Sequence, residues 1–436
     1  MSNLSEARRV YDTVISRTLA NGTTCASYFA TIHVEATNLL ASLCHTRGQR
    51  ALVGRVCMDN PSFCPDYYRD ETPETSTTAT EETISHIHSL KSTTVNPIIT
   101  PRFAPTCSPE ALTSLGSLAA SYSPPLHIQT HISENLAECA LVKTLFPSHA
   151  NYTALYDAFS LLTPRTILAH GVHLSPDERS LIAQRRAKIS HCPASNSALG
   201  SGLAPLRDLL DAGIEVGLGT DVSGGFSPSI LQAARQACLV SRLLRHTATA
   251  TATASSIDGN DPKNNEKTES QEGREVLSVE DALYLATRGG ALVIDMPDDL
   301  GGFDEGMFWD VQLVRLGSAV SCPPIESNGG GNIQDRETVS GSDSQSAVDL
   351  FGWESWPEKI HKWVWTGDDR NVRSVWVRGR LVHSLDQNPK GSKAGSSSRI
   401  SIGLGDGYGF VRDWARWAVG GLGIAALGLV LGRKLA

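Results

Sequence analysis

The chain has 436 residues, of which 40% are hydrophobic and 19% charged, so it is long enough to bury one large core and a smaller one. Its formal net charge of −8 argues against a nucleic-acid partner, because phosphate binding needs a basic face. Its nine cysteines are odd in number and form no C-x-x-C pair, which argues against a disulfide framework and favours a reducing compartment.

The first predicted element is a helix over residues 4–19, which is followed by the helix-ending pair Asn21-Gly22. From there to about Arg245, short apolar runs of strand length alternate with amphipathic stretches. The predicted strands are Thr23–Phe29, Ala51–Met58, Val95–Phe103, Leu126–His131, Thr166–His170, Ala187–His191 and Ile214–Thr220. Two of the stretches between them, 108–120 and 175–186, open with Ser-Pro, which is typical of a capped helix start.

Strands that alternate with helices predict a parallel sheet with right-handed crossovers. A doubly wound sheet would place its site at one switch point, whereas a closed barrel places functional residues at the carboxyl ends of many strands. Nearly every predicted strand here ends in polar or reactive residues, which favours an α/β fold of the (β/α)8 TIM-barrel type. Seven strands are present and the chain opens on a helix, so we expect the barrel to lack its first strand.

Three strand-end clusters carry candidate chemistry: His131 with Glu134 in QTHISEN, His170 in LAHGVHL, and Asp221 in GLGTDVSGG. An imidazole beside a carboxylate suits hydrolysis by zinc, which lowers the pKa of its bound water while the carboxylate moves the proton. Taken singly, a strand-end histidine is often structural, and an Asp after Gly-Thr is often a helix cap. Their joint placement at one barrel mouth favours an active site.

Other histidines are assigned to simpler roles. His33-Val34-Glu35 mimics the H-x-E of zinc nucleobase deaminases, but the chain has no P-C-x-x-C to complete such a site. We predict that His173 and the helical pair His86 and His88 are surface residues.

Taken together, several strings resemble the guanine deaminase family of the amidohydrolase superfamily. They are TLANGTTCASYFATIH, GQRALVGRVCMD, ITPRFAPTCS, IQTHISEN, LAHGVHLS, ISHCPASNSALGSG and GLGTDVSGG. The resemblance runs from about Tyr11 to Arg245 and resumes over Ser278–Asp295 and Trp365–Val382.

The resemblance implies hydrolysis of guanine to xanthine and ammonia with one zinc ion per subunit, in a homodimer. By matching motif, His131 and Asp221 become zinc ligands and Glu134 the proton shuttle. His170 becomes the residue that orients the attacking hydroxide. Arg102 would bind the purine on its carbonyl side and Phe103 against its face, a fork-shaped donor and an aromatic wall that suit a planar substrate.

The chain also departs from the family pattern. The family's first strand ends in an H-x-H pair that supplies two further zinc ligands, and an N-terminal segment completes a small β domain. Neither is found here, so we expect impaired zinc binding and activity. The intact later motifs favour part of a longer active enzyme over a degenerate relative.

We expect a barrel over residues 1–245, and the last barrel helix and the start of the small β domain over 277–316. The remainder of that domain is expected over 351–395. Residues 246–276 and 317–350 are predicted disordered insertions, because their composition cannot bury a core.

The end of the chain is apolar. Residues 396–410 form a predicted linker and 411–436 a hydrophobic tail, with sixteen uncharged residues between Arg416 and Arg433. As a helix these span about 24 Å, against a hydrocarbon core of about 30 Å. We weigh a tail anchor through 414–433, with the catalytic domain in the cytoplasm, against a glycine-rich helix that docks on the protein.

Two further functions stay open from the sequence. One is a non-catalytic relative that binds a purine or a protein; the other is an amidohydrolase for another aminopurine or a triazine. The strings PRF and HISEN favour guanine.

Overall fold

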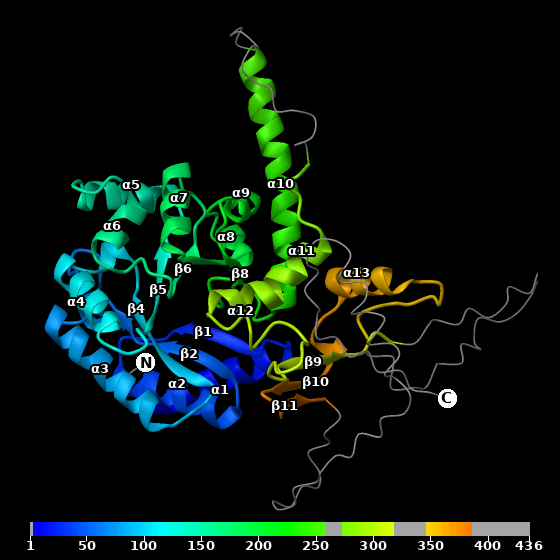
Figure 1. Cartoon of the computed structure of the whole chain (residues 1–436), viewed down its shortest axis with the longest axis horizontal. Coiled ribbons are helices and arrows are strands. Elements are labelled where there is room, and N and C mark those ends of the chain that lie inside the picture. Colours follow the sequence, from blue (N-terminus) through cyan, green and yellow to red (C-terminus); the bar gives the residue numbers. More distant parts are fainter. Residues whose placement is uncertain (1–2, 258–272, 318–345, 386–436) are drawn as a thin grey trace, which may run out of the picture.

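The structure is a computed structural model that describes residues 3–257, 273–317 and 346–385 (Figure 1). Its main sheet follows the order β1-β2-β4-β5-β6-β7-β8, with β3 paired to β4, and all of its pairs are parallel. The strands are β1 (Cys25–Phe29), β2 (Arg50–Gly54), β3 (Val56–Cys57), β4 (Val95–Pro101), β5 (His127–Ile132), β6 (Thr166–His170), β7 (Lys188–His191) and β8 (Val216–Leu218).

All seven predicted strands are therefore confirmed, and Thr166–His170 coincides with β6. The run Ala51–Met58 is divided into β2 and β3 at Arg55. The side chain of Arg55 is buried and forms an ion pair with buried Asp70, so a charged residue interrupts an otherwise apolar strand. A buried charge of this kind needs such a partner.

The sheet curls as an open barrel, with β1 and β8 as its two ends; within the described ranges neither end strand pairs with the other. This confirms the predicted TIM-type barrel without its first strand. Helix α1 (Leu4–Ala20) precedes the first strand. The helices that follow the strands are α2 (Val34–Arg47), α3 (Pro73–Ser89), α4 (Pro109–Ala120), α5 (Leu136–Leu145), α6 (Tyr152–Ala158), α7 (Pro176–Arg185), α8 (Pro193–Ala198), α9 (Leu206–Asp211) and α10 (Ile230–Ile257).

Capping side chains fix where two of these helices begin. The Ser108 hydroxyl accepts the amide of Ala111 at the start of α4, and Ser175 accepts the amide of Glu178 at the start of α7. Each satisfies an amide that has no partner inside the helix. Both predicted helix starts are confirmed.

The main core lies between the sheet and its helices, and includes fully buried Leu112, Leu115 and Ile189. A second core joins α1, α2 and the first strands. Inside the curled sheet, Leu52, Ile98 and Ile167 form a small apolar cluster. The open barrel therefore has a packed centre, with functional side chains left to its ends.

A small antiparallel sheet, in the order β11-β10-β9, confirms the predicted part of a β domain. It consists of β9 (Val311–Val314), β10 (Val372–Val377) and β11 (Arg380–Ser384) and lies near α13 (Trp356–Thr366). The two-residue turn between β10 and β11 uses Arg378 and Gly379, both at positive φ, as tight hairpins require.

Part of the predicted insertion 246–276 is wrong, because α10 continues to Ile257 and projects from the body of the molecule (Figure 1). The alanines of its Thr/Ala run favour helix formation. Low-complexity composition of this kind is otherwise typical of segments that bury no core. Most of the second insertion and the hydrophobic tail lie outside the described residues. Along the described ranges, no helix is long and apolar enough to cross a membrane.

Candidate active site

The candidate site lies where β5 and β6 end. His131 is the penultimate residue of β5, His170 is the final residue of β6, and Glu134 lies two residues after the end of β5. The two imidazole rings are stacked, with centroids 5.3 Å apart, and His170 Nε2 lies 3.9 Å from Glu134 Oε2. The structure thus brings together three residues that the sequence singles out.

Hydrogen bonds fix which nitrogen of His131 carries its proton. His131 Nδ1 lies 2.7 Å from the carbonyl oxygen of Arg102, which can only accept, so Nδ1 is the donor. Burial, and then the charge of His170, lower the pKa of His131 to about 3. His131 is therefore neutral at physiological pH, with the lone pair of Nε2 available to a metal or substrate.

His170 is held in the same manner. Its side chain is buried, and Nδ1 donates to Asn196 Oδ1 at 2.8 Å, which directs Nε2 toward Glu134. Glu134 is fixed in turn by Ser201, whose hydroxyl donates to Oε1 at 3.0 Å. Asn196 and Ser201 belong to the string ISHCPASNSALGSG, whose contribution to the site the sequence analysis left unassigned.

The backbone is strained at this end of the sheet. Ser133 (φ 48°), His170 (φ 73°) and Asp221 (φ 44°) lie in the left-handed region, which residues with a Cβ seldom adopt. Such conformations cluster at functional sites, where the surrounding structure fixes a side chain in one direction.

A wall of aromatic rings borders the histidines. Phe103 follows β4 and packs edge-on to His131 at 6.3 Å, and the Arg102 guanidinium lies 5.3 Å from the Phe103 ring centre. Phe29, at the end of β1, also packs against His131, with ring centroids 4.5 Å apart, and is not predicted as a site residue from the sequence. The exposed Arg102 side chain and these rings could hold a flat, hydrogen-bonding molecule.

Asp221 is the remaining strand-end candidate. It follows β8, and no hydrogen bond, ion pair or ring contact within the described part of the chain joins it to His131 or His170. A Cβ at Gly224 would lie 2.7 Å from Asp221 Oδ2 and 3.1 Å from Ser195 Oγ, so only glycine fits beside the carboxylate. Burial and the charge of Asp221 raise the pKa of Cys192 to about 12, which places a neutral thiol nearby.

The described residues do not complete a metal site by themselves. Over residues 3–257, 273–317 and 346–385, no three histidine, cysteine, aspartate or glutamate side chains are grouped to hold a metal ion. A zinc site needs three or four such donors. The predicted ligands His131 and Asp221 are thus too few for zinc without donors from elsewhere.

His191, at the end of β7, is a further buried imidazole. Its side chain is 1% exposed, and neither ring nitrogen has a hydrogen-bond partner in the described structure. Burial, and then the charge of His170, lower its pKa to about 4. The position of His191 at a strand end is predictable from the sequence, whereas its burial without hydrogen-bond partners among the described residues is not.

Of the three histidines predicted at the surface, only His88 is exposed, whereas His173 and His86 are half-buried, each with a hydrogen-bond partner. His173 is half-buried, and its Nε2 lies 2.7 Å from the carbonyl oxygen of Ser201, because the strained turn after β6 brings it against the loop after α8. His88 is exposed on α3, as predicted, and His86 is half-buried there against the Ser42 hydroxyl at 3.0 Å.

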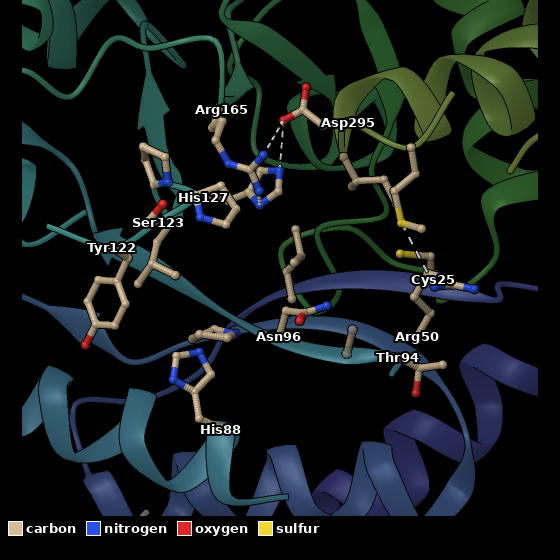
Figure 2. A pocket seen from close by; sticks show the side chains of 18 residues that line it. Cys25, Arg50, His88, Thr94, Asn96, Tyr122, Ser123, His127, Arg165 and Asp295 are labelled. Carbon is tan, nitrogen blue, oxygen red and sulfur yellow. Dashed lines mark hydrogen bonds and ion pairs between the residues drawn. The ribbon is translucent and has the colours of Figure 1, made fainter. Parts of the chain in front are cut away.

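A cavity lies at the opposite end of the sheet, where the strands begin, and Figure 2 shows the residues that line it. Its volume is about 340 Å³, and Cys25, Arg50 and His127, the first residues of β1, β2 and β5, line it. At this end, His127 Nε2 binds Asp295 at 2.9 Å, and Arg165 Nη2 binds His127 Nδ1 at 3.0 Å (Figure 2). These contacts lie at the end of the barrel where the strands begin. In such folds the chemistry is carried by the opposite end, where the strands finish.

Comparison with known proteins relates the chain to hydrolases of one family. The model of the amidohydrolase family matches residues 2–382. The chain is 44% identical to a probable guanine deaminase of Schizosaccharomyces pombe over 388 residues, which are 88% of this chain and 64% of that protein. It is 37% identical to human guanine deaminase over 87% of this chain and 73% of that protein.

Solved structures give the same relationship. Guanine deaminase from C. acetobutylicum, with guanine bound in its active site, is 32% identical, with a TM-score of 0.69 over 87% of this chain and 77% of that one. An adenosine deaminase from Xanthomonas campestris with bound zinc is 19% identical, with a TM-score of 0.62 over 88% and 72%. The second likeness shows the fold alone.

Proposed function

Because this chain belongs to the amidohydrolase family, and within it to the guanine deaminase group, we propose that its site hydrolyses guanine to xanthine and ammonia. The chain spans 64% of the length of the fission-yeast relative, so the activity of the longer relatives is applied here as a proposal. The observation that carries it is the pairing of His170 with Glu134 beside His131, next to the Arg102–Phe103 wall.

The reaction adds water to the amino-bearing ring carbon and releases the amino group. A C–O bond forms, the C–N bond breaks, and a proton must move from the water to the departing nitrogen. Glu134 is suited to carry this proton, since its Oε1 is held by Ser201 while its Oε2 faces the site. His170, oriented by Asn196, would present one fixed nitrogen to the oxygen that attacks.

Substrate binding falls to the residues that follow β4. The Arg102 guanidinium offers donors in one plane, which match the carbonyl edge of guanine, and the Phe103 ring offers a face to the purine. Both side chains border His131, so the bound ring would lie over the imidazoles. We further propose His131 and Asp221 as two ligands of one zinc ion per subunit, with the other donors outside the described residues. The predicted homodimer, cytoplasmic location and tail anchor stay predictions.

The test supplies guanine, adenine or an amino-triazine, with zinc sulfate, to the purified 436-residue protein and measures xanthine, hypoxanthine and ammonia. We expect xanthine and ammonia in equal amounts from guanine, at a rate lowered by the small number of metal donors in the described part of the chain, and no product from the other two substrates. Hypoxanthine from adenine, or deamination of the triazine, would favour another amidohydrolase reaction. Guanine binding without any product would support a non-catalytic purine-binding protein.

A further inference from the structure

Two buried tyrosines from α6 lie directly behind the strand-end residues of the site. We propose that the hydroxyl of Tyr156 is a positioning group that fixes the purine-binding pair Arg102 and Phe103 relative to the imidazole of His131. This inference rests on the proposed function, since it concerns the geometry of the same site. Tyr156 itself touches neither the substrate nor the reacting atoms.

The hydroxyl of Tyr156 joins the ends of two neighbouring strands. It donates to the carbonyl oxygen of His131 at 2.8 Å and accepts the backbone amide of Ala104 at 3.1 Å. Ala104 directly follows Phe103, whereas His131 is on β5. One oxygen atom therefore holds the segment after β4 and the end of β5 at a fixed spacing.

The side chain of Thr130 adds a second connection between the same segments. Its hydroxyl lies 3.0 Å from the Tyr156 hydroxyl and 3.4 Å from the carbonyl oxygen of Arg102. Because the single proton of Tyr156 is donated to His131, its two lone pairs accept the Ala104 amide and one proton from either Thr130 or Tyr152, and the hydroxyl is fully satisfied. The same carbonyl of Arg102 accepts the proton of His131 Nδ1, so the network fixes both the position and the tautomer of that imidazole.

A third segment is connected through Tyr152. Its hydroxyl lies 3.2 Å from that of Tyr156 and 3.3 Å from the amide of Ala104. Glu138 is a close neighbour of Tyr152. Burial raises the pKa of Tyr152 most, and the charges of Tyr156 and then Glu138 raise it further. The Glu138 carboxylate also accepts the backbone amide of Glu134 at 2.9 Å. The network thus connects the segments that carry the Arg102–Phe103 pair, His131 and Glu134, the residues that would bind or transform the purine.

The hydrogen bonds of the Tyr156 hydroxyl do not depend on pH near neutrality. Tyr156 is fully buried, and burial raises its pKa far above its usual value, so the hydroxyl keeps its proton wherever the protein is folded. The aromatic ring packs in the main core, and a phenylalanine would keep that packing. Positioning by Tyr156 therefore depends on one oxygen atom, which a Tyr156→Phe variant removes alone.

The test compares Tyr156→Phe with Tyr28→Phe, a matched control. The Tyr28 hydroxyl also makes a hydrogen bond to a side chain, Gln49 Oε1 at 2.7 Å, but it faces the core around α2. Three quantities are measured below the unfolding temperature: KM for guanine, kcat for guanine, and the hydrogen-exchange rate of the Ala104 amide.

In Tyr156→Phe we expect kcat/KM for guanine to fall by about 10- to 100-fold with a rise in KM, because small misplacements of binding groups are costly. Exchange at Ala104 should become about tenfold faster, since its amide keeps only the longer contact with Tyr152. Tyr28→Phe should change neither kcat/KM nor the exchange rate of Ala104 by more than about twofold. Both variants lose one hydrogen bond, so a general loss of stability would affect them alike, whereas a loss of positioning affects Tyr156→Phe alone.

Equal KM and equal Ala104 exchange in the two variants would overturn the positioning role. If the wild-type protein neither binds nor deaminates guanine, the proposed function fails, and the exchange rate decides the structural part separately. Faster exchange confined to Tyr156→Phe would then still support a network that fixes the segment after β4. Unchanged exchange would refute it.

Discussion

The ion pair between Arg50 and Asp310 joins the first residue of β2 to the residue before β9. Arg50 Nε lies 3.0 Å from Asp310 Oδ2, and Nη2 lies 3.1 Å from Oδ1. Both side chains are 5% exposed. Asp310→Asn would leave the Arg50 charge buried without its partner, which typically costs about 3–5 kcal/mol of unfolding free energy.

The chain contains a matched exposed pair. Arg47 also makes two hydrogen bonds with Asp12, at 2.7 and 2.6 Å, but these side chains are 45% and 39% exposed. Asp12→Asn should therefore cost less than about 1 kcal/mol. The two pairs share the same two-bond geometry and differ mainly in burial, with one added contact at Asp310, whose Oδ1 also accepts the amide of Arg378 at 2.7 Å.

Urea unfolding followed by circular dichroism measures both variants at neutral pH. We expect a clearly lower midpoint for Asp310→Asn and nearly the wild-type midpoint for Asp12→Asn. Equal losses in the two variants would refute the reasoning, since burial would then not determine the strength of the pair.

Three other predictions concern stability and activity. Because the pKa of His191 falls from 6.5 to about 4 on folding, the unfolded state binds more protons between these values, and stability should drop by roughly 3 kcal/mol as pH falls from 6.5 to 4. In unfolding titrations at several pH values, His191→Gln should remove this part of the acid dependence. Asn196→Ala removes the acceptor that orients His170, so steady-state kinetics should show kcat about 10- to 100-fold lower. In thermal melts, Gly289→Ala should cost about 1–3 kcal/mol, because its Cβ would lie 2.3 Å from a carbonyl oxygen of β8, whereas helical Gly290→Ala meets nothing within 4 Å and should stabilise by up to about 1 kcal/mol.

Periodicity and capping residues are local properties, which is why the sequence predicts the strands and helix starts of the barrel well. Ser108 and Ser175 illustrate this, since each makes the capping contact that its sequence position predicts. The meeting of His131, Glu134 and His170 also follows from the rule that parallel strands end at one edge.

Other parts of the site depend on contacts between distant segments. Asn196 orients His170 from 26 residues away, and Tyr156 reaches His131 from another helix, so no spacing in the sequence indicates either contact. His191 shows the same limit: its strand end is predictable, but whether its ring nitrogens find partners depends on what packs around it. The continuation of α10 to Ile257 is not predicted from the sequence, because the low-complexity Thr/Ala composition of this stretch is typical of segments that bury no core.

Guanine deamination at this site requires Glu134 as its proton carrier. The direct measurement is the initial rate of xanthine formation by Glu134→Gln, with Glu110→Gln, an exposed carboxylate in the first turn of α4, as control. We predict a loss of about 10²- to 10⁴-fold for Glu134→Gln, with guanine still bound, and the wild-type rate for Glu110→Gln. Xanthine formation at the wild-type rate in Glu134→Gln would contradict the proposed site.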